Sequence, residues 1–325
     1  MSLNSLFAIK THTSIYDGNI NHIPLNEKDD ESMNDSSRVE TKQENKILEG
    51  SIFGNLMIPV AIVLVGALII FGVTKMISTE RSYKDLVNEM QSKTFGNRWI
   101  AAYELSKQIT ASQIPESDIP WLVTNLKEVF DSARDPRTKE FIVVAIGALH
   151  HKNTISFLTK VLGLNDPKMS FHAIVAIGNM KGPIPMEWSK LENFLDSKDE
   201  GLQQAAILTL STHRVGTSEI RIQNFLNHER SSLRYSSALG LINFKNTNAI
   251  SVLKEILNIK TAGVTQTPKG QIGANDILGL KLNILHAARR EKWKALNDSF
   301  QKLAKDNDNK KVSLKAVEVL KLLKN

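Results

Sequence analysis

The sequence contains no cysteine, which excludes disulfide bonds, thiol catalysis and thiolate metal sites. It also contains no Walker-type phosphate loop, no Gly-x-Ser-x-Gly nucleophile elbow and no His-Glu-x-x-His zinc pair. His150 and His151 are adjacent, so on a helix they would point about 100° apart and chelate a metal poorly. At a helix C-terminus they are better suited to interact with its carbonyl groups. We therefore expect no enzymatic activity, no cofactor, no metal and no small-molecule substrate.

Charge is absent from one long stretch, residues 50–74. As a helix this stretch would be roughly 38 Å long, enough to cross a hydrocarbon layer of about 30 Å. A cleaved signal peptide would be shorter and would lie nearer the N-terminus. A buried core helix seldom remains uncharged for so long. The pattern therefore predicts one transmembrane helix over residues 50–76 and a single-pass membrane protein, expected in a bacterial inner membrane.

The two sides of this span differ in charge. Residues 1–49 hold five lysines and arginines against nine acidic residues, whereas residues 75–325 hold 36 against 25. The tail is predicted to be an acidic, disordered spacer or to carry a short partner-binding motif. Four basic residues follow the span closely and three precede it, which faintly favours a cytoplasmic C-terminal body. The lack of cysteine favours export instead.

Short apolar motifs recur along residues 80–325. Ile-Val-Val-Ala-Ile-Gly-Ala at 142–148 is followed by Ala-Ile-Val-Ala-Ile-Gly-Asn at 173–179. One marker residue can be taken from each unit: Leu105, Ile146, Ile177, Leu210, Leu241, Leu285 and Leu320. The middle markers are separated by 31, 33 and 31 residues, and the longer intervals of 41 and 44 correspond to that period plus a loop. A period of this length indicates a stacked repeat array.

Each unit reads as two helices joined by a turn with an acidic cap. Asp135, Asp166 and Asp199 each lie 11 residues before a marker, where a carboxylate can accept free backbone N–H groups of the second helix. Pro136 and Pro167 follow two of them, at a position where a missing N–H costs nothing. The second helices are rich in alanine and glycine, which allows neighbouring helices to approach closely.

The units resemble HEAT repeats, and most closely the HEAT-like repeats of phycobilin lyases and their relatives. The resemblance covers roughly residues 81–325 and is strongest in the second to fifth units. It rests on the Asp-Pro turn, the Ala-Ile-Gly core, and a basic residue that opens the second helix, namely Arg98, Arg137, Lys168 or Arg234. It implies an all-α fold, a right-handed α-solenoid of about seven helix pairs that serves as a protein-binding scaffold. In that family the basic residues form a ladder of internal turn contacts, which is the alternative to ligand contact.

The last two units depart from this pattern. Residues 258–275 combine glycine, proline, threonine and glutamine and are predicted to be an insertion loop, either functional or not. Residues 306–311 are predicted to form a turn before a closing helix in which lysine alternates with leucine and valine.

The expected interaction surface is a basic row on the concave face. Arg98, Lys139 and Arg234 all lie seven residues before their markers, and Arg289 and Arg290 form a second basic group. Such a row favours an acidic, extended segment of another protein, bound in a salt-sensitive way.

The expected function is therefore a membrane-anchored scaffold without chemistry of its own. A basic solenoid that binds nucleic acid or anionic lipid is an alternative, because phosphate contacts need only lysine and arginine. A degenerate HEAT-like enzyme is another, since some HEAT-like proteins are DNA glycosylases with a basic groove. The lysines and arginines are spread through all the units, and the aromatic-basic motif of an RNA-binding module is missing. Nucleic acid is therefore not the expected partner.

Overall fold

The computed structural model describes residues 81–92, 98–260 and 274–324, and all of their regular elements are helical. The predicted tail, the predicted span at 50–76 and most of the predicted loop at 258–275 lie outside these residues. Among the helices that the structure describes, none combines the length and apolar character needed to cross a bilayer.

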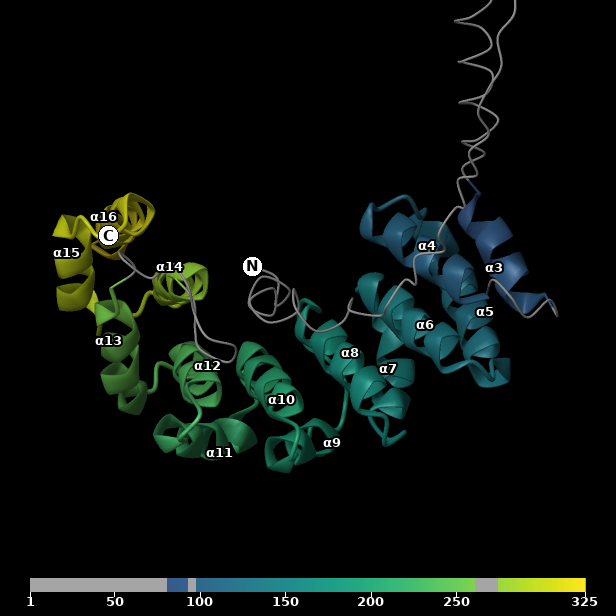
Figure 1. Cartoon of the computed structure of the whole chain (residues 1–325), viewed down its shortest axis with the longest axis horizontal. Coiled ribbons are helices and arrows are strands. Elements are labelled where there is room, and N and C mark those ends of the chain that lie inside the picture. The colour runs from purple at the N-terminus through teal and green to yellow at the C-terminus, as the bar shows by residue number, and fades with distance from the viewer. Residues whose placement is uncertain (1–80, 93–97, 261–273, 325) are drawn as a thin grey trace, which may run out of the picture. The chain divides into compact units, whose positions relative to one another are not determined.

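The described residues contain seven helix pairs. They follow one another in chain order, as the repeat period predicts (Figure 1). The first helices of the pairs are α3 (Tyr83–Gln91), α5 (Ile119–Ser132), α7 (Ile155–Val161), α9 (Ser189–Glu192) with η3 (Asn193–Asp196), α11 (Glu219–Asn224) with η5 (Phe225–Asn227), α13 (Ile250–Asn258) and α15 (Asn297–Lys305). The second helices are α4 (Arg98–Thr110), α6 (Pro136–Ala148), α8 (Pro167–Gly178), α10 (Glu200–Thr212), α12 (Ser231–Leu241), α14 (Ala274–Arg290) and α16 (Lys310–Lys324).

Short 3-10 helices occupy several of the connections. They are η1 (Glu116–Asp118), η2 (Lys152–Thr154), η4 (Gly216–Ser218), η6 (Ile242–Phe244) and η7 (Thr247–Ala249). Consecutive second helices pack on one another from α4 to α12, and α14 packs on α16. In Figure 1 the second helices line the inner side of the array and the first helices line its outer side. This is the helix-pair architecture expected of a HEAT-like α-solenoid.

Acidic residues begin three of the second helices. Asp135, Asp166 and Asp199 are the N-cap residues of α6, α8 and α10, and each side chain accepts at least one backbone N–H of the first turn. Partial burial would raise the pKa of the Asp135 carboxyl. The hydrogen bonds that it accepts from Thr138 and Arg137 outweigh this effect and hold the pKa below its usual value.

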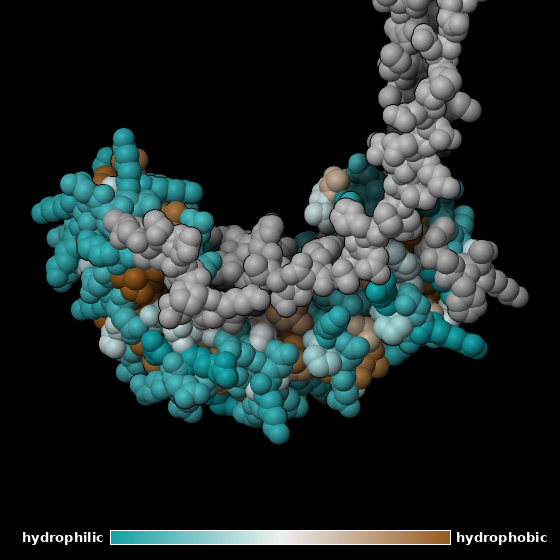
Figure 2. Space-filling view, in the orientation of Figure 1, coloured by the Kyte–Doolittle hydropathy of each residue, from teal (hydrophilic) through white to brown (hydrophobic). Residues whose placement is uncertain are grey.

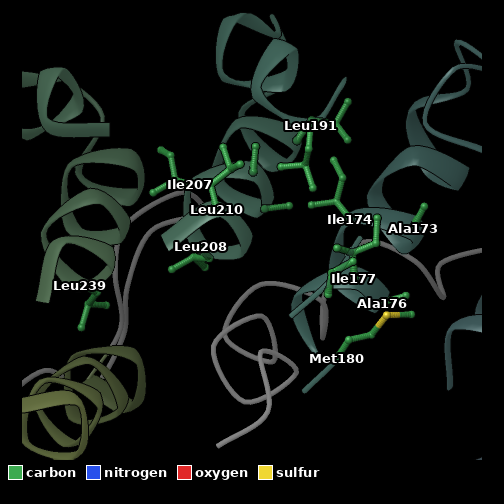
Figure 3. Packing of buried hydrophobic residues seen from close by; sticks show 14 of the residues in the cluster. Ala173, Ile174, Ala176, Ile177, Met180, Leu191, Ile207, Leu208, Leu210 and Leu239 are labelled. Atoms are coloured by element: carbon green, nitrogen blue, oxygen red, sulfur yellow. The ribbon is translucent and has the colours of Figure 1, made fainter. Parts of the chain in front are cut away.

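The core runs continuously through the pairs. In Figure 3, Ile174 and Ile177 of α8 lie in one cluster with Leu191 of α9 and with Ile207 and Leu210 of α10, and all five side chains are buried. Each second helix therefore packs against its own first helix and against the second helix of the next pair.

Small residues set the spacing between second helices. A Cβ atom added to Gly147 of α6 would lie 2.6 Å from the Cβ of Ala176 in α8. One added to Gly240 of α12 would lie 2.8 Å from the Cβ of Ser211 in α10. Separations below 3.0 Å between such atoms are not tolerated, so glycine is required at both positions for this helix spacing.

Left-handed residues end several second helices. Ser112, His150, Arg214, Lys245 and Lys292 have φ between 48° and 56°. At four of these ends, Ser112, Arg214, Lys245 and Lys292, the next residue donates its N–H to a carbonyl five positions earlier, for example Asn246 to Leu241 at 3.1 Å. These are Schellman-type ends formed without glycine. They reverse the chain and direct it to the first helix of the next pair.

Candidate protein-interaction surface

Aromatic rings gather on the inner sides of α4 and α6. The core-facing side of α6 is marked by the buried residues Ile142 and Ile146, and Phe141 lies away from it, half-buried. Its ring stacks on Trp99 of α4 with centroids 6.3 Å apart and an interplanar angle of 26°. It also meets Tyr103 of α4 edge to face, with centroids 5.3 Å apart. The three half-buried rings form one cluster that bridges two repeats.

Exposed cations lie over two of these rings. The Lys107 ammonium is 4.3 Å from the Tyr103 ring centroid, and the Arg137 guanidinium carbon is 5.9 Å from the Trp99 centroid. Both distances are within the range of a cation–π interaction. The cluster therefore presents apolar ring surface and positive charge side by side.

Neighbouring second helices contact one another on the inner side at a repeated pair of positions. The residue six positions before the marker of one helix contacts the residue five positions before the marker of the next second helix. The contacts join Trp99 to Phe141, Glu140 to His172, and Gln204 to Ser236. The hydrogen bonds are 3.3 Å for Glu140–His172 and 2.8 Å for Gln204–Ser236. The hydrogen bond from His172 is the main cause that holds the pKa of the Glu140 carboxyl below its usual value.

The predicted basic row does not lie on this inner side. Arg98 donates from Nε to the Ser92 carbonyl at 2.9 Å, and Arg234 donates from Nη1 to the His228 carbonyl at 3.0 Å. Each arginine thus contacts a carbonyl six residues before itself, in the connection between the two helices of a pair. The Lys139 ammonium lies 5.2 Å from the ring centroid of Phe130, a residue of the first helix α5.

The reason for this difference is the offset of seven residues. Seven residues are close to two helical turns, so each basic residue lies on the same side as its marker. The markers Leu105, Ile146 and Leu241 are fully buried. The row therefore faces the first helices and the turns, as in the ladder of internal contacts that the family resemblance offered as the alternative.

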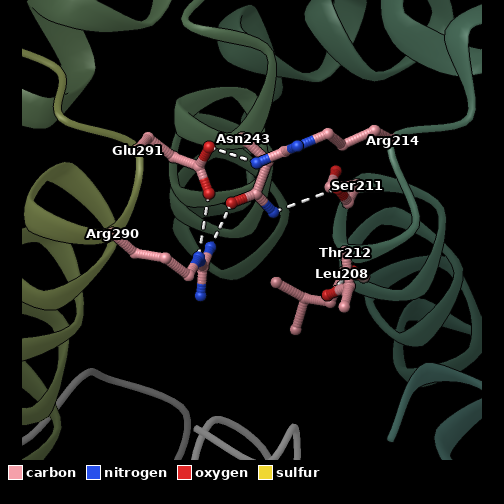
Figure 4. A network of polar contacts seen from close by, with 7 residues as sticks. All are labelled: Leu208, Ser211, Thr212, Arg214, Asn243, Arg290 and Glu291. Carbon is pink, nitrogen blue, oxygen red and sulfur yellow. Dashed lines mark hydrogen bonds and ion pairs between the residues drawn. The ribbon is translucent and has the colours of Figure 1, made fainter. Parts of the chain in front are cut away.

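Arg289 and Arg290 also have partners within the chain. Arg289 pairs with Glu318 of α16 at 2.8 Å. Arg290 donates from Nε to Glu291 at 2.9 Å and also contacts Asn243. Figure 4 shows Arg290 at the junction of three pairs.

Glu291 is the centre of that junction. Its buried carboxylate accepts from Arg290 and from Arg214, which follows α10 and is 77 residues away in sequence. Asn243 completes the network by donating from Nδ2 to the Ser211 carbonyl at 3.0 Å (Figure 4). The network connects the C-terminal ends of α10, α12 and α14 through hydrogen bonds and ion pairs. Arg290 therefore contributes to the packing of these three pairs.

A buried ion pair lies deeper in the last two pairs. Lys281 of α14 has a side chain that is 2% exposed, and its Nζ is 3.7 Å from Oδ2 of Asp308, whose side chain is 5% exposed. Burial lowers the pKa of the Lys281 ammonium, and Asp308 and Asp306 oppose that shift. The sequence analysis did not single out Lys281, although it lies four residues before the marker Leu285 and therefore on the same side of the helix.

Metal binding has no support among the described residues, which contain no group of three or more histidine or acidic side chains suited to a metal. His150 instead occupies the left-handed end of α6.

Comparisons with known proteins return structural similarity alone. No protein-family model and no curated protein sequence matches this chain. Similar solved structures include the complex of CpcE and CpcF of phycocyanin lyase from Nostoc sp. PCC7120, with 14% identity and a TM-score of 0.49, covering 74% of this chain and 94% of that one.

Two other similar structures are repeat proteins. The archaeal HEAT-like repeats protein from Thermococcus onnurineus NA1 has 16% identity and a TM-score of 0.37, covering 75% of this chain and 97% of that one. A designed armadillo repeat protein has 13% identity and a TM-score of 0.34, covering 74% and 100%. The assignment of an α-solenoid rests on the stacked helix pairs of this chain itself.

Proposed function

We propose that residues 83–324 form a scaffold that binds another protein along the inner sides of α4, α6 and α8 and has no chemistry of its own. The observation that supports this is the ring cluster of Trp99, Tyr103 and Phe141 with cations over two of the rings. Half-buried aromatic residues with arginine beside them are typical of the energetically dominant part of a protein interface.

The proposed partner is an acidic, extended segment. The exposed cations Lys107, Arg137 and Lys168 lie on α4, α6 and α8, and the last two flank the same carboxylate, Glu140. We propose that these three residues contact the partner in place of Arg98, Lys139 and Arg234. The two arginines donate to carbonyl groups of the turns, and Lys139 lies over the Phe130 ring. Charge pairing at an exposed surface weakens with added salt, so binding is expected to be salt-sensitive.

We also propose that residues 50–76 anchor the chain in a membrane as a single span, with the scaffold in the cytoplasm. The support is the uncharged stretch and the slight excess of basic residues after it. Alkaline carbonate is expected to leave the full chain in the membrane fraction. Because the sequence has no cysteine, Ile220→Cys introduces a single thiol at an exposed site, and a membrane-impermeant maleimide should fail to label it in intact cells.

The partner surface can be tested by photo-cross-linking of the full chain. A photoreactive residue at Tyr103 on the inner side is expected to capture a discrete protein. The same residue at Ile220, 74% exposed on the outer helix α11, is expected to capture none. Equal capture from both positions would contradict the proposed surface.

Charge reversal then tests the chemistry of the partner. The triple variant Lys107→Glu, Arg137→Glu and Lys168→Glu should abolish capture at Tyr103 with little change in thermal stability, because all three side chains are exposed. The matched control Lys152→Glu, Lys198→Glu and Lys254→Glu makes the same change in charge at exposed sites away from α4, α6 and α8. Loss of capture in the control would show that net charge alone, and not this surface, is responsible.

A further inference from the structure

Apolar side chains are exposed on α16 to an unusual degree. Its buried side, Val312, Ala316, Val319 and Leu323, packs on α14 and α15. Its other side exposes Leu314 (61%), Val317 (37%) and Leu322 (51%). In the part of the chain that the structure describes, only three other large hydrophobic side chains are exposed, and they lie far apart in sequence: Trp121, Leu164 and Ile220. Figure 2 shows brown side chains among hydrophilic ones at this end.

The same side of α16 is strongly basic. The helix contains five lysines and a single acidic residue, Glu318. That carboxylate is already shared by Lys315 at 2.7 Å and Arg289 at 2.8 Å. Lys302 and Lys305 in the last turn of α15 add to the positive charge.

Lysines flank two apolar residues along one stripe of α16. Lys310, Leu314, Val317 and Lys321 occupy positions i, i+4, i+7 and i+11, which lie on one side of an α-helix. All four side chains are exposed. A lysine stem can lie along apolar material while its ammonium group stays in a polar layer. This arrangement suits an interface between an apolar layer and negative charge.

Two other occupants fit the stripe poorly. A second copy of the chain would bring two basic surfaces together. A further repeat would have to bury lysines, whereas the closest approach between inner pairs is made by small uncharged residues such as Gly147 and Ala176. A bilayer surface that contains anionic lipid supplies both an apolar interior and phosphate charge.

We propose that the exposed side of α16 docks on an anionic lipid surface. Leu314, Val317 and Leu322 enter the boundary between headgroups and acyl chains, and Lys310, Lys311, Lys321 and Lys324 contact lipid phosphates. This docking does not depend on the partner-binding surface at the other end of the array. It also does not require the span, because α16 itself makes the contact.

Docking of the full chain can be measured with a fluorophore attached at position 314. Leu314→Cys introduces a single thiol, which is labelled with an environment-sensitive NBD fluorophore. The protein is placed in vesicles of phosphatidylcholine alone, or with about 30% phosphatidylglycerol. We expect a blue-shifted emission and quenching by spin-labelled lipid in the anionic vesicles only, with reversal at high salt. The same label at Ile220→Cys is expected to remain in a polar environment in both.

A lysine variant sharpens the test. Each lysine near an anionic surface strengthens binding by about fivefold, so changing Lys310, Lys311, Lys321 and Lys324 to glutamine should lower the docked-to-free ratio by at least about a hundredfold. The fold should remain intact, because these side chains are exposed. The control variant changes the exposed lysines 152, 198, 245 and 254 to glutamine and should lower the ratio far less.

Three outcomes would overturn the proposal. The first is an unchanged polar signal at position 314 in anionic vesicles. The second is a blue shift in neutral vesicles that grows with protein density, which would indicate a second copy of the chain. The third is a response at position 314 to soluble polyglutamate without any response to anionic lipid, which would indicate an acidic protein.

Discussion

The middle and the end of the array are held together differently. From α6 to α12, adjacent second helices meet through small side chains at Gly147 and Gly240, and the core between them is apolar. From α14 to α16, the interior includes the charged side chains of Lys281, Asp308 and Glu291. The last helix also exposes leucine and valine. The repeat motif is therefore clearest where the second helices approach each other most closely.

The difference shows how a solenoid can vary without losing its architecture. Each pair contacts mainly its neighbours, so stability is a sum of local terms. A polar interior can then replace an apolar one at an end without affecting the distant pairs. Substitutions in the two regions should therefore change stability independently of each other.

The largest effect is expected from Lys281→Met. Removing the ammonium takes away the cation that is paired with the buried Asp308 carboxylate, which should lower the free energy of unfolding by about 3–5 kcal/mol. Hydrogen–deuterium exchange should rise in α14–α16 and stay unchanged in α4–α8. The double variant Lys281→Met and Asp308→Leu should recover much of the loss, because apolar residues often replace a buried ion pair without penalty.

Lys260→Met is the matched control for that experiment. It breaks the neighbouring Lys260–Asp306 pair, which has a shorter distance of 2.8 Å but a mostly exposed lysine. An exposed pair contributes about 0–1 kcal/mol. If Lys260→Met cost as much as Lys281→Met, burial would not be the cause of the larger effect.

An intermediate effect is expected from Gly147→Ala and Gly240→Ala. The added methyl groups meet Ala176 and Ser211 and should lower the free energy of unfolding by about 1–3 kcal/mol, measured by urea unfolding followed by circular dichroism. Gly216→Ala is the control, since no atom lies within 4 Å of the added carbon. Ala176→Gly in the Gly147→Ala background should restore part of the loss. A stabilised Gly147→Ala variant would show that α6 and α8 can separate easily.

The smallest effect is expected from Asp135→Ala. Loss of the cap should cost about 1 kcal/mol at neutral pH. The folded-state pKa of Asp135 is lowered from 3.8, so the contribution of its charged form is fully present above that value. It is lost as the pH falls below 3.8 through the folded-state pKa. The melting temperatures of the variant and the original protein should therefore converge at low pH, and a constant difference would show that ionisation is not involved.

Much of the array could be predicted from the sequence because its signals are local. The caps at Asp135, Asp166 and Asp199, the number of helix pairs and the turn before the closing helix all depend on residues within one unit. The aromatic cluster on the inner side could also have been predicted from the sequence. Trp99 and Tyr103 are four residues apart, as are Arg137 and Phe141, and such pairs share one side of a helix.

The predicted basic row faces the turns and the first helices, and not the inner side on which we propose that a partner binds. Equal spacing from a marker correctly placed Arg98, Lys139 and Arg234 in equivalent positions, but the markers themselves face the core. The inner side lies opposite the markers, where Phe141 and Val144 of α6 are half-buried. Periodicity gives the relative position of residues on a helix and does not say which neighbour each side meets.

The helix pairs, their period and their caps follow from the order of residues alone, because these features depend on backbone hydrogen bonds and apolar spacing over a few turns. The contacts between units could be known only from the folded chain. Arg214 meets Glu291 across 77 residues, and the Lys281 side chain is buried beside Asp308 while similar lysines lie at the surface. Burial and pairing of charge depend on how successive units stack, and the stacking places together residues that are far apart in the chain.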